Sequence, residues 1–154
     1  MARLVGISEA VSLGVHTMVL LAQQPDRRFT NQEIARALHA SWHHLAKVMR
    51  HLVKVGLVDS IRGPGGGFVL AKPARKVTLL DVFEAIEGPL EKDSCFARTQ
   101  LCQGPSCVLG QAFRSVHEQL RKFLRSTTLA QLAGDKPLRF CHDQATDERG
   151  RVRR

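Results

Sequence analysis

The sequence lacks any apolar run approaching the ~20 residues that a membrane span needs, although 44% of its 154 residues are hydrophobic. Its N-terminal segment is amphipathic, with Glu9 and His16, and lacks the apolar core and small-residue cleavage site of a signal peptide. The charged fraction of 24% is ordinary and predicts neither disorder nor membrane insertion. We therefore expect a cytoplasmic protein with no membrane partner.

The chain has few of the features that mark common enzymes. Its 4 cysteines include no Cys-x-x-Cys pair, the spacing of thiol oxidoreductases, and none has an evident adjacent base at a catalytic spacing. The glycine-rich stretch at 63–67 is not followed by the Lys-Ser/Thr pair of a phosphate-binding loop. These absences favour a binding protein over an enzyme.

Acidic residues are also scarce, with 14 Asp and Glu against 23 Lys and Arg, which gives a net charge of +9. The imbalance is concentrated between Arg36 and Lys76, where Asp59 is the single acidic residue. The basic residues of this segment are Arg36, Lys47, Arg50, Lys54, Arg62, Lys72, Arg75 and Lys76. A local basic surface of this kind favours a polyanionic partner.

Apolar periodicity predicts a pair of helices near the N-terminus. Ser8 is suited to cap the first helix, which should run to about Gln23. Thr30 opens the capping box Thr-Asn-Gln-Glu, which predicts a short second helix through Leu38. A proline between the two helices ends the first one.

A third helix is predicted immediately after a tight turn at 39–41. The helix begins at Ser41, and its apolar residues recur at helical intervals from Leu45 to Val55. Gly56 follows where a left-handed cap belongs. The opposite face of this helix is basic. Two helices joined by a short turn, the second with a basic outer face, are typical of a helix-turn-helix that enters the major groove of DNA.

A β-hairpin is predicted next in the chain. Residues 57–62 and 68–70 have the composition of strands, and the glycines of 63–67 form the turn between them. The expected fold is therefore mainly α-helical with a small β-hairpin wing, a winged helix-turn-helix. A merely flexible hairpin and a merely solvated basic face are the alternative interpretations.

The predicted DNA-contacting residues fall into three groups. The cations of the third helix would contact phosphates, the residues at its start would reach base edges, and the glycine tip of the wing would bring an arginine to the backbone or the minor groove. Together these residues are Thr30, Ser41, Trp42, His43, His44, Lys47, Arg50, Lys54, Arg62, Gly65 and Gly66.

A helix is predicted from Thr78 to about Glu87, and it completes a DNA-binding domain at 1–88. The rest of the chain divides into three further parts. Residues 89–107 are polar and carry cysteines, 108–133 contain a long helix and a short last helix, and 134–154 have the composition of a disordered basic tail. The long helix has more apolar surface than one chain can cover, which predicts a homodimer.

Cys95, Cys102 and Cys107 lie in one segment, with six and then four residues between them. Thiolate sulfur is a soft ligand that suits iron-sulfur clusters or zinc. A thiol/disulfide switch and unliganded cysteines are further alternatives. Three thiolates leave a fourth position open, and Cys141 lies in the predicted tail, so a carboxylate or histidine would have to complete the site.

These motifs together resemble the Rrf2 family of transcription regulators, which includes iron-sulfur, nitric-oxide-sensing and iron-responsive members. The resemblance rests on His-Leu-Ala-Lys-Val at 44–48, Gly-Leu-Val at 56–58, the wing sequence at 62–67, and three cysteines before a long helix. It covers residues 3–133, and the wing and the cysteine segment are specific in combination.

The resemblance implies a homodimer on a pseudo-palindromic DNA operator, with a 2Fe-2S or 4Fe-4S cluster held by the three cysteines. It also implies that Glu9, donated by the other subunit, completes the coordination, whereas a carboxylate at this place could equally stabilise a helix N-terminus. The spacing of the three cysteines departs from the equal intervals usual in the family. Gly110 stands where some relatives have a histidine ligand. Zinc-stabilised or cluster-free DNA binding without a sensing role is the alternative.

Overall fold

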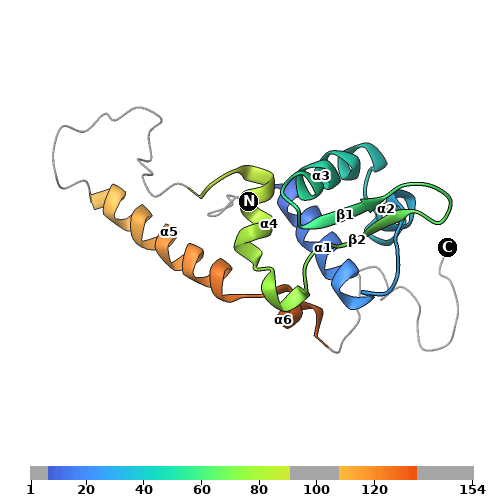
Figure 1. The fold of residues 1–154 in the computed structure, drawn as a ribbon. Helices are drawn as coiled ribbons and strands as arrows, with labels where there is room; N and C mark the ends of the chain where they lie inside the picture. Colours follow the sequence, from blue (N-terminus) through green and yellow to red (C-terminus); the bar gives the residue numbers. More distant parts are fainter. Residues whose placement is uncertain (1–6, 91–107, 135–154) are drawn as a thin grey trace, which may run out of the picture.

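A computed structural model of the chain describes residues 7–90 and 108–134 (Figure 1). Helices α1, α2 and α3 are followed by the hairpin β1–β2, a 3-10 turn η1, and helices α4, α5 and α6. Their bounds are α1 Glu9–Gln23, α2 Asn31–Ala37, α3 Trp42–Lys54, β1 Val58–Ile61, β2 Gly67–Leu70, η1 Ala74–Lys76, α4 Leu79–Glu87, α5 Val108–Ser126 and α6 Leu129–Ala133. The predicted fold class, mainly helical with one hairpin, is confirmed.

The helix ends follow the capping residues predicted from the sequence. The Ser8 side chain accepts a hydrogen bond from the backbone N–H of Val11, and Thr30 forms a complete capping box at the start of α2. Gly56 has a φ of 69°, the left-handed conformation expected after α3. One boundary differs, because α2 ends at Ala37 and Leu38 is its C-cap.

The core forms where α1 packs against α3, α4 and α6. Its fully buried side chains include Met18, Leu21, Ile34, Leu45, Met49, Leu52 and Leu129. Burying each such side chain stabilises the fold by about 1.5–3 kcal/mol relative to leaving it exposed. Because Leu129 belongs to α6, the last described helix shares one core with the helix-turn-helix.

The wing is an antiparallel hairpin that is attached to the segment before α2. Ser60 pairs with Phe68 across the two strands, and Phe68 also exchanges two backbone hydrogen bonds with Phe29, of 3.1 and 2.8 Å. The first strand is one residue shorter at each end than predicted, and the second is one residue longer, because Gly67 belongs to β2 instead of the turn. A Cβ atom on Gly67 would lie 2.8 Å from the Phe29 carbonyl oxygen, so the close approach of the two backbones requires glycine.

The second half of the described chain is held by backbone pairing at the base of α5. The Leu79 N–H donates to the Thr127 carbonyl at 2.9 Å, and the Leu129 N–H donates to the Val77 carbonyl at 2.9 Å. From this base α5 extends away from the winged helix (Figure 1). None of the helices in the described ranges is long and apolar enough to cross a membrane.

Candidate nucleic-acid interface

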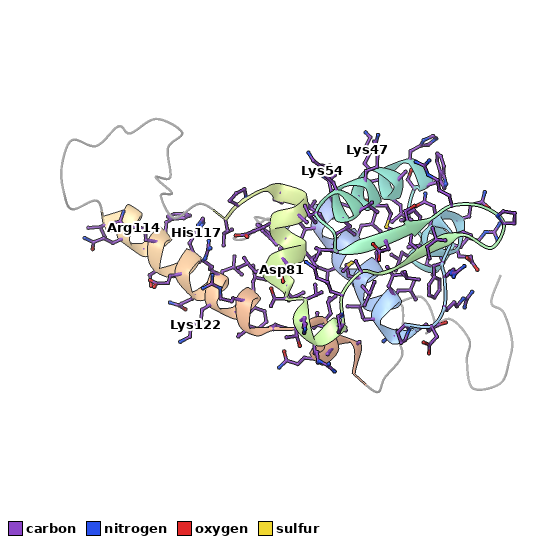
Figure 2. The ribbon with its side chains drawn as sticks, viewed as in Figure 1. Lys47, Lys54, Asp81, Arg114, His117 and Lys122 are labelled. Atoms are coloured by element: carbon purple, nitrogen blue, oxygen red, sulfur yellow. The ribbon has the colours of Figure 1, made fainter. Side chains whose placement is uncertain are left out.

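The orientation of α3 is determined by its buried stripe. Leu45, Val48, Met49 and Leu52 are at most 2% exposed. Because a helix turns about 100° per residue, burial of these positions directs the basic positions outward. Lys47 and Lys54 accordingly project from the outer side of α3 (Figure 2).

The first turn of α3 presents two aromatic rings and polar backbone groups. Trp42 is 50% exposed, and the His43 ring meets it edge-on with centroids 4.8 Å apart. Ser41, at the N-cap, makes no capping hydrogen bond with its side chain. The Asn31 amide donates to the Trp42 carbonyl at 3.4 Å, which ties the start of α2 to the start of α3.

A hollow of about 730 Å³ separates α3 from the wing. Its α3 side includes Trp42, Ala46 and Arg50, and its wing side includes Ser60 and Phe68. The exposed surface of α3 is therefore not uniformly basic. Apolar and basic side chains of α3, including Lys47 and Lys54, line this hollow together.

His44 has a different environment from the other predicted base-reading residues. Its Nδ1 lies 3.7 Å from Oε1 of Glu9 at the start of α1, and its side chain is 33% exposed against 87% for Glu9. The two side chains thus form a weak, solvent-screened ion pair when the imidazole is protonated. Glu9, the candidate cluster ligand, is thus near the beginning of α3, the predicted DNA-contacting helix, of its own chain.

The wing tip is positioned by a residue that the sequence analysis missed. The Arg28 guanidinium donates to the Gly65 carbonyl oxygen at 3.3 Å, which links the tip to the segment before α2. Arg62 and Gly65 are exposed, and Gly66 is half-buried. Two adjacent arginines before the predicted capping box were the available signal, but their contact with the wing depends on residues far along the chain.

The backbone N–H and the hydroxyl of Thr30, a predicted DNA-contacting residue, form hydrogen bonds within the cap of α2. They donate to Glu33 Oε2 at 2.7 and 2.9 Å, and Arg27 bonds the other carboxylate oxygen at 3.0 Å. These hydrogen bonds, the backbone one first, hold the pKa of Glu33 below its ordinary value of 4.5. The cap thereby fixes the entry into the helix-turn-helix.

The predicted cluster ligands lie mostly outside the described residues. Cys95, Cys102 and Cys107 belong to 91–107, and Cys141 belongs to 135–154. Within the described ranges, no three His, Cys, Asp or Glu side chains are grouped so that they could hold a metal ion. Among the predicted ligands, Glu9 alone belongs to the part of the chain that the structure describes, and its carboxylate is in solvent.

The segment that carries these cysteines begins next to an anchored residue. The Leu90 N–H donates to Glu84 Oε1 at 3.3 Å, and the Leu90 carbonyl accepts from Arg121 at 2.9 Å. The Arg121 guanidinium is also 3.6 Å from the same Glu84 oxygen. Both backbone groups of Leu90 are therefore bound by side chains of α4 and α5.

Comparison with known proteins identifies relatives over most of the chain. The family model Rrf2, described as an iron-dependent transcriptional regulator, matches residues 7–135. An HTH-type transcriptional regulator of Aquifex aeolicus is 30% identical over 81% of this chain and 89% of its own length. The HTH-type regulator BadM of Rhodopseudomonas palustris is 40% identical, over 53% of this chain and 52% of BadM, about half of each protein.

Solved structures share the fold. CymR, the global cysteine regulator of B. subtilis, has a TM-score of 0.72 at 24% identity, covering 87% of this chain and all (100%) of CymR. IscR of T. potens has a TM-score of 0.68 at 25% identity, covering 83% of this chain and 85% of the IscR chain. The arrangement of α3 beside the wing is thus one already seen in transcription regulators.

The lowered pKa of Glu33 predicts a specific pH dependence of stability. The ionised carboxylate stabilises the fold above the ordinary pKa of 4.5, and this contribution is lost as pH falls through the lower folded-state value. We expect Glu33→Gln to melt at a lower temperature than wild type at pH 7, with the difference shrinking as the pH is lowered to about 3. Thermal unfolding followed by circular dichroism measures this, and a difference that stays constant with pH would contradict the assignment.

Proposed function

The chain belongs to the Rrf2 family of transcriptional regulators, and we propose that it is a cytoplasmic homodimer that binds a double-stranded operator and senses nitric oxide, redox state or iron status through an iron-sulfur cluster. Family membership agrees with the sequence-based expectation that the chain is not an enzyme. The observation that carries the DNA-binding part is the exposed basic face of α3 beside the wing.

In this proposal α3 lies in the major groove and the wing lies on the adjacent backbone. Lys47, Arg50 and Lys54 bind phosphates, which provides affinity that is independent of sequence and falls with salt. Trp42 and His43, in the first turn, are suited to meet base edges, since the N-terminal residues of a recognition helix do so. The backbone N–H groups of this turn lack a Ser41 side-chain cap and can bind phosphate oxygen.

The wing contributes a second contact. Gly65 and Gly66 at its tip allow the backbone to approach the duplex closely, and Arg62 supplies a guanidinium for phosphate or a narrow minor groove. Arg28 and the Phe29–Phe68 pairing hold the hairpin to the segment before α2, and β1 also packs against α3. A hairpin held in this way would let helix and wing bind the same duplex together.

The homodimer is proposed from the outer face of α5. Val108, Val116 and Phe123 are 78%, 49% and 58% exposed. At 100° per residue they fall, with Ala112, on one side of the helix. An apolar helix face of this extent is expected to be covered, and a second copy of α5 would cover it while placing two α3 helices on two half-sites.

The cluster is proposed from the three cysteines, and their chemistry fits it. Cys95, Cys102 and Cys107 offer soft thiolates, and the exposed Glu9 offers a hard carboxylate that would complete the set from the other subunit. When bound, a 2Fe-2S or 4Fe-4S group would supply reactivity toward nitric oxide, oxygen species or iron shortage. The family description as iron-dependent supports this proposal.

Leu90 offers a physical route from the cysteine segment to the DNA. Its backbone groups are bound to Glu84 of α4 and Arg121 of α5, and α4 packs against both α1 and α3. A change in the order of residues 91–107 would therefore act on α4 and on the base of the proposed dimer helix. The spacing of the two α3 helices would change as a result, and operator affinity would change with it.

We expect Lys47→Ala to weaken binding to all duplex sequences and to reduce the slope of log K against log salt by about 0.9, because one phosphate contact is lost. Fluorescence anisotropy over a salt series measures this. Arg114→Ala is the matched control, since Arg114 is exposed on α5 (Figure 2). Equal salt slopes for Lys47→Ala and wild type would contradict the placement of α3.

We expect Phe123→Asp to convert the dimer into monomers, because the carboxylate would be buried in the apolar α5 interface without a partner. Light scattering coupled to size exclusion gives the mass. Arg125→Asp adds an acid to an exposed position away from the apolar face and should remain dimeric. A Phe123→Asp protein that keeps the dimer mass would rule out this interface.

We expect Cys102→Ala to lose the visible absorption, iron and acid-labile sulfide of anaerobically purified protein, and to change operator affinity while the dimer survives. Cys141→Ala, outside the proposed ligand set, should keep all three. Unchanged absorption in Cys102→Ala would contradict the ligand assignment. Wild-type protein that contains zinc without sulfide would instead support the zinc-stabilised alternative.

A further inference from the structure

The hollow between α3 and the wing is mainly apolar, although it lies in the most basic part of the fold. Trp42, Ala46 and Val53 of α3 and Phe68 of β2 form its walls, and Met49 is buried at 2% exposure. Water in such a hollow gains little from its surroundings, so an apolar group of a bound partner is favoured there.

The charges around the hollow define the kind of partner. Lys47, Arg50 and Lys54 line it from α3, and Asn31 and Ser60 add polar groups from α2 and β1. A partner that complements this arrangement carries regularly spaced anions beside apolar groups. One strand of a DNA duplex meets this description, because phosphates would bind the cations while the groove-facing groups enter the hollow.

The apolar group that a base presents in the major groove is the C5 methyl of thymine. Trp42 and Ala46 are one helical turn apart on the same side of α3, in the part of the helix that reaches base edges. We propose that this hollow selects operators by accepting thymine methyl groups against Trp42 and Ala46, a role that rests on the proposed DNA binding.

The walls of the hollow suit this role. Ala46 is half-buried and has the smallest side chain that α3 contributes to the lining. The backbone of Phe68 is held by its two hydrogen bonds to Phe29, which fixes the strand that carries the opposite wall. A cytosine or a uracil at the same position would leave the apolar surface without a contact.

The test uses duplexes that differ only in this methyl group. The full-length protein first selects its binding sequence from a random duplex library, and single thymines of one half-site are then replaced by deoxyuridine. Each methyl that enters the hollow should contribute about fourfold in affinity. Thymines outside the half-site, replaced in the same way, should have no effect.

Protein variants distinguish a direct contact with the methyl group from an effect of the methyl group on the shape of the duplex. Trp42→Ala should bind the thymine and deoxyuridine duplexes with nearly equal affinity, because the wall of the hollow is gone. Since Trp42 is half exposed, the variant should keep its fold, which its melting temperature checks. Lys47→Ala should weaken binding to both duplexes by the same factor and retain the ratio between them.

The outcomes are distinguishable. Equal binding of thymine and deoxyuridine duplexes by the wild-type protein would overturn the inference and leave the proposed DNA binding intact. A thymine preference that persists in Trp42→Ala would overturn it as well, because the effect would then come from the duplex. A library that yields no bound duplex would instead overturn the proposed function itself.

Discussion

The buried stripe on α3 is the constraint on which the other features depend. Leu45, Val48, Met49 and Leu52 have one way to leave water, which is to face the core formed with α1. Their burial fixes the rotation of the helix about its own axis. Every exposed residue of α3, whether basic or aromatic, takes its direction from this packing. The surface chemistry of α3 is therefore specified by the residues that the helix buries.

The position of the exposed wing also depends on contacts with other parts of the chain. Its two short strands would be marginal alone, but Phe29 adds a third backbone partner and Gly67 allows that partner to come close. The tip is then held by Arg28. A small hairpin thus becomes a fixed wall opposite α3, and the hollow between them has a defined shape.

Local features of the fold could be predicted from the sequence, because caps and periodicity act within a few residues. The capping box at Thr30 and the left-handed Gly56 are examples. Contacts between distant segments could not be predicted, since no pattern records which turn meets which strand. Arg28 at Gly65, Glu9 at His44 and α6 in the core are of this kind. The hollow also needs α3 and β2 to be placed together before it exists.

Because α5 is attached near its C-terminal end, a small tilt at that end would move the opposite end by a larger distance. Thr127 is bonded to the start of α4 and Arg121 is held at Leu90, whereas the Val108 end extends from the body. A helix of 19 residues is about 28 Å long at the usual rise per residue. A tilt of about 5° at its base would move its far end by about 2.5 Å over that length. A small rearrangement around Leu90 would thereby be enlarged into a displacement comparable to an atomic diameter at the tip of the helix.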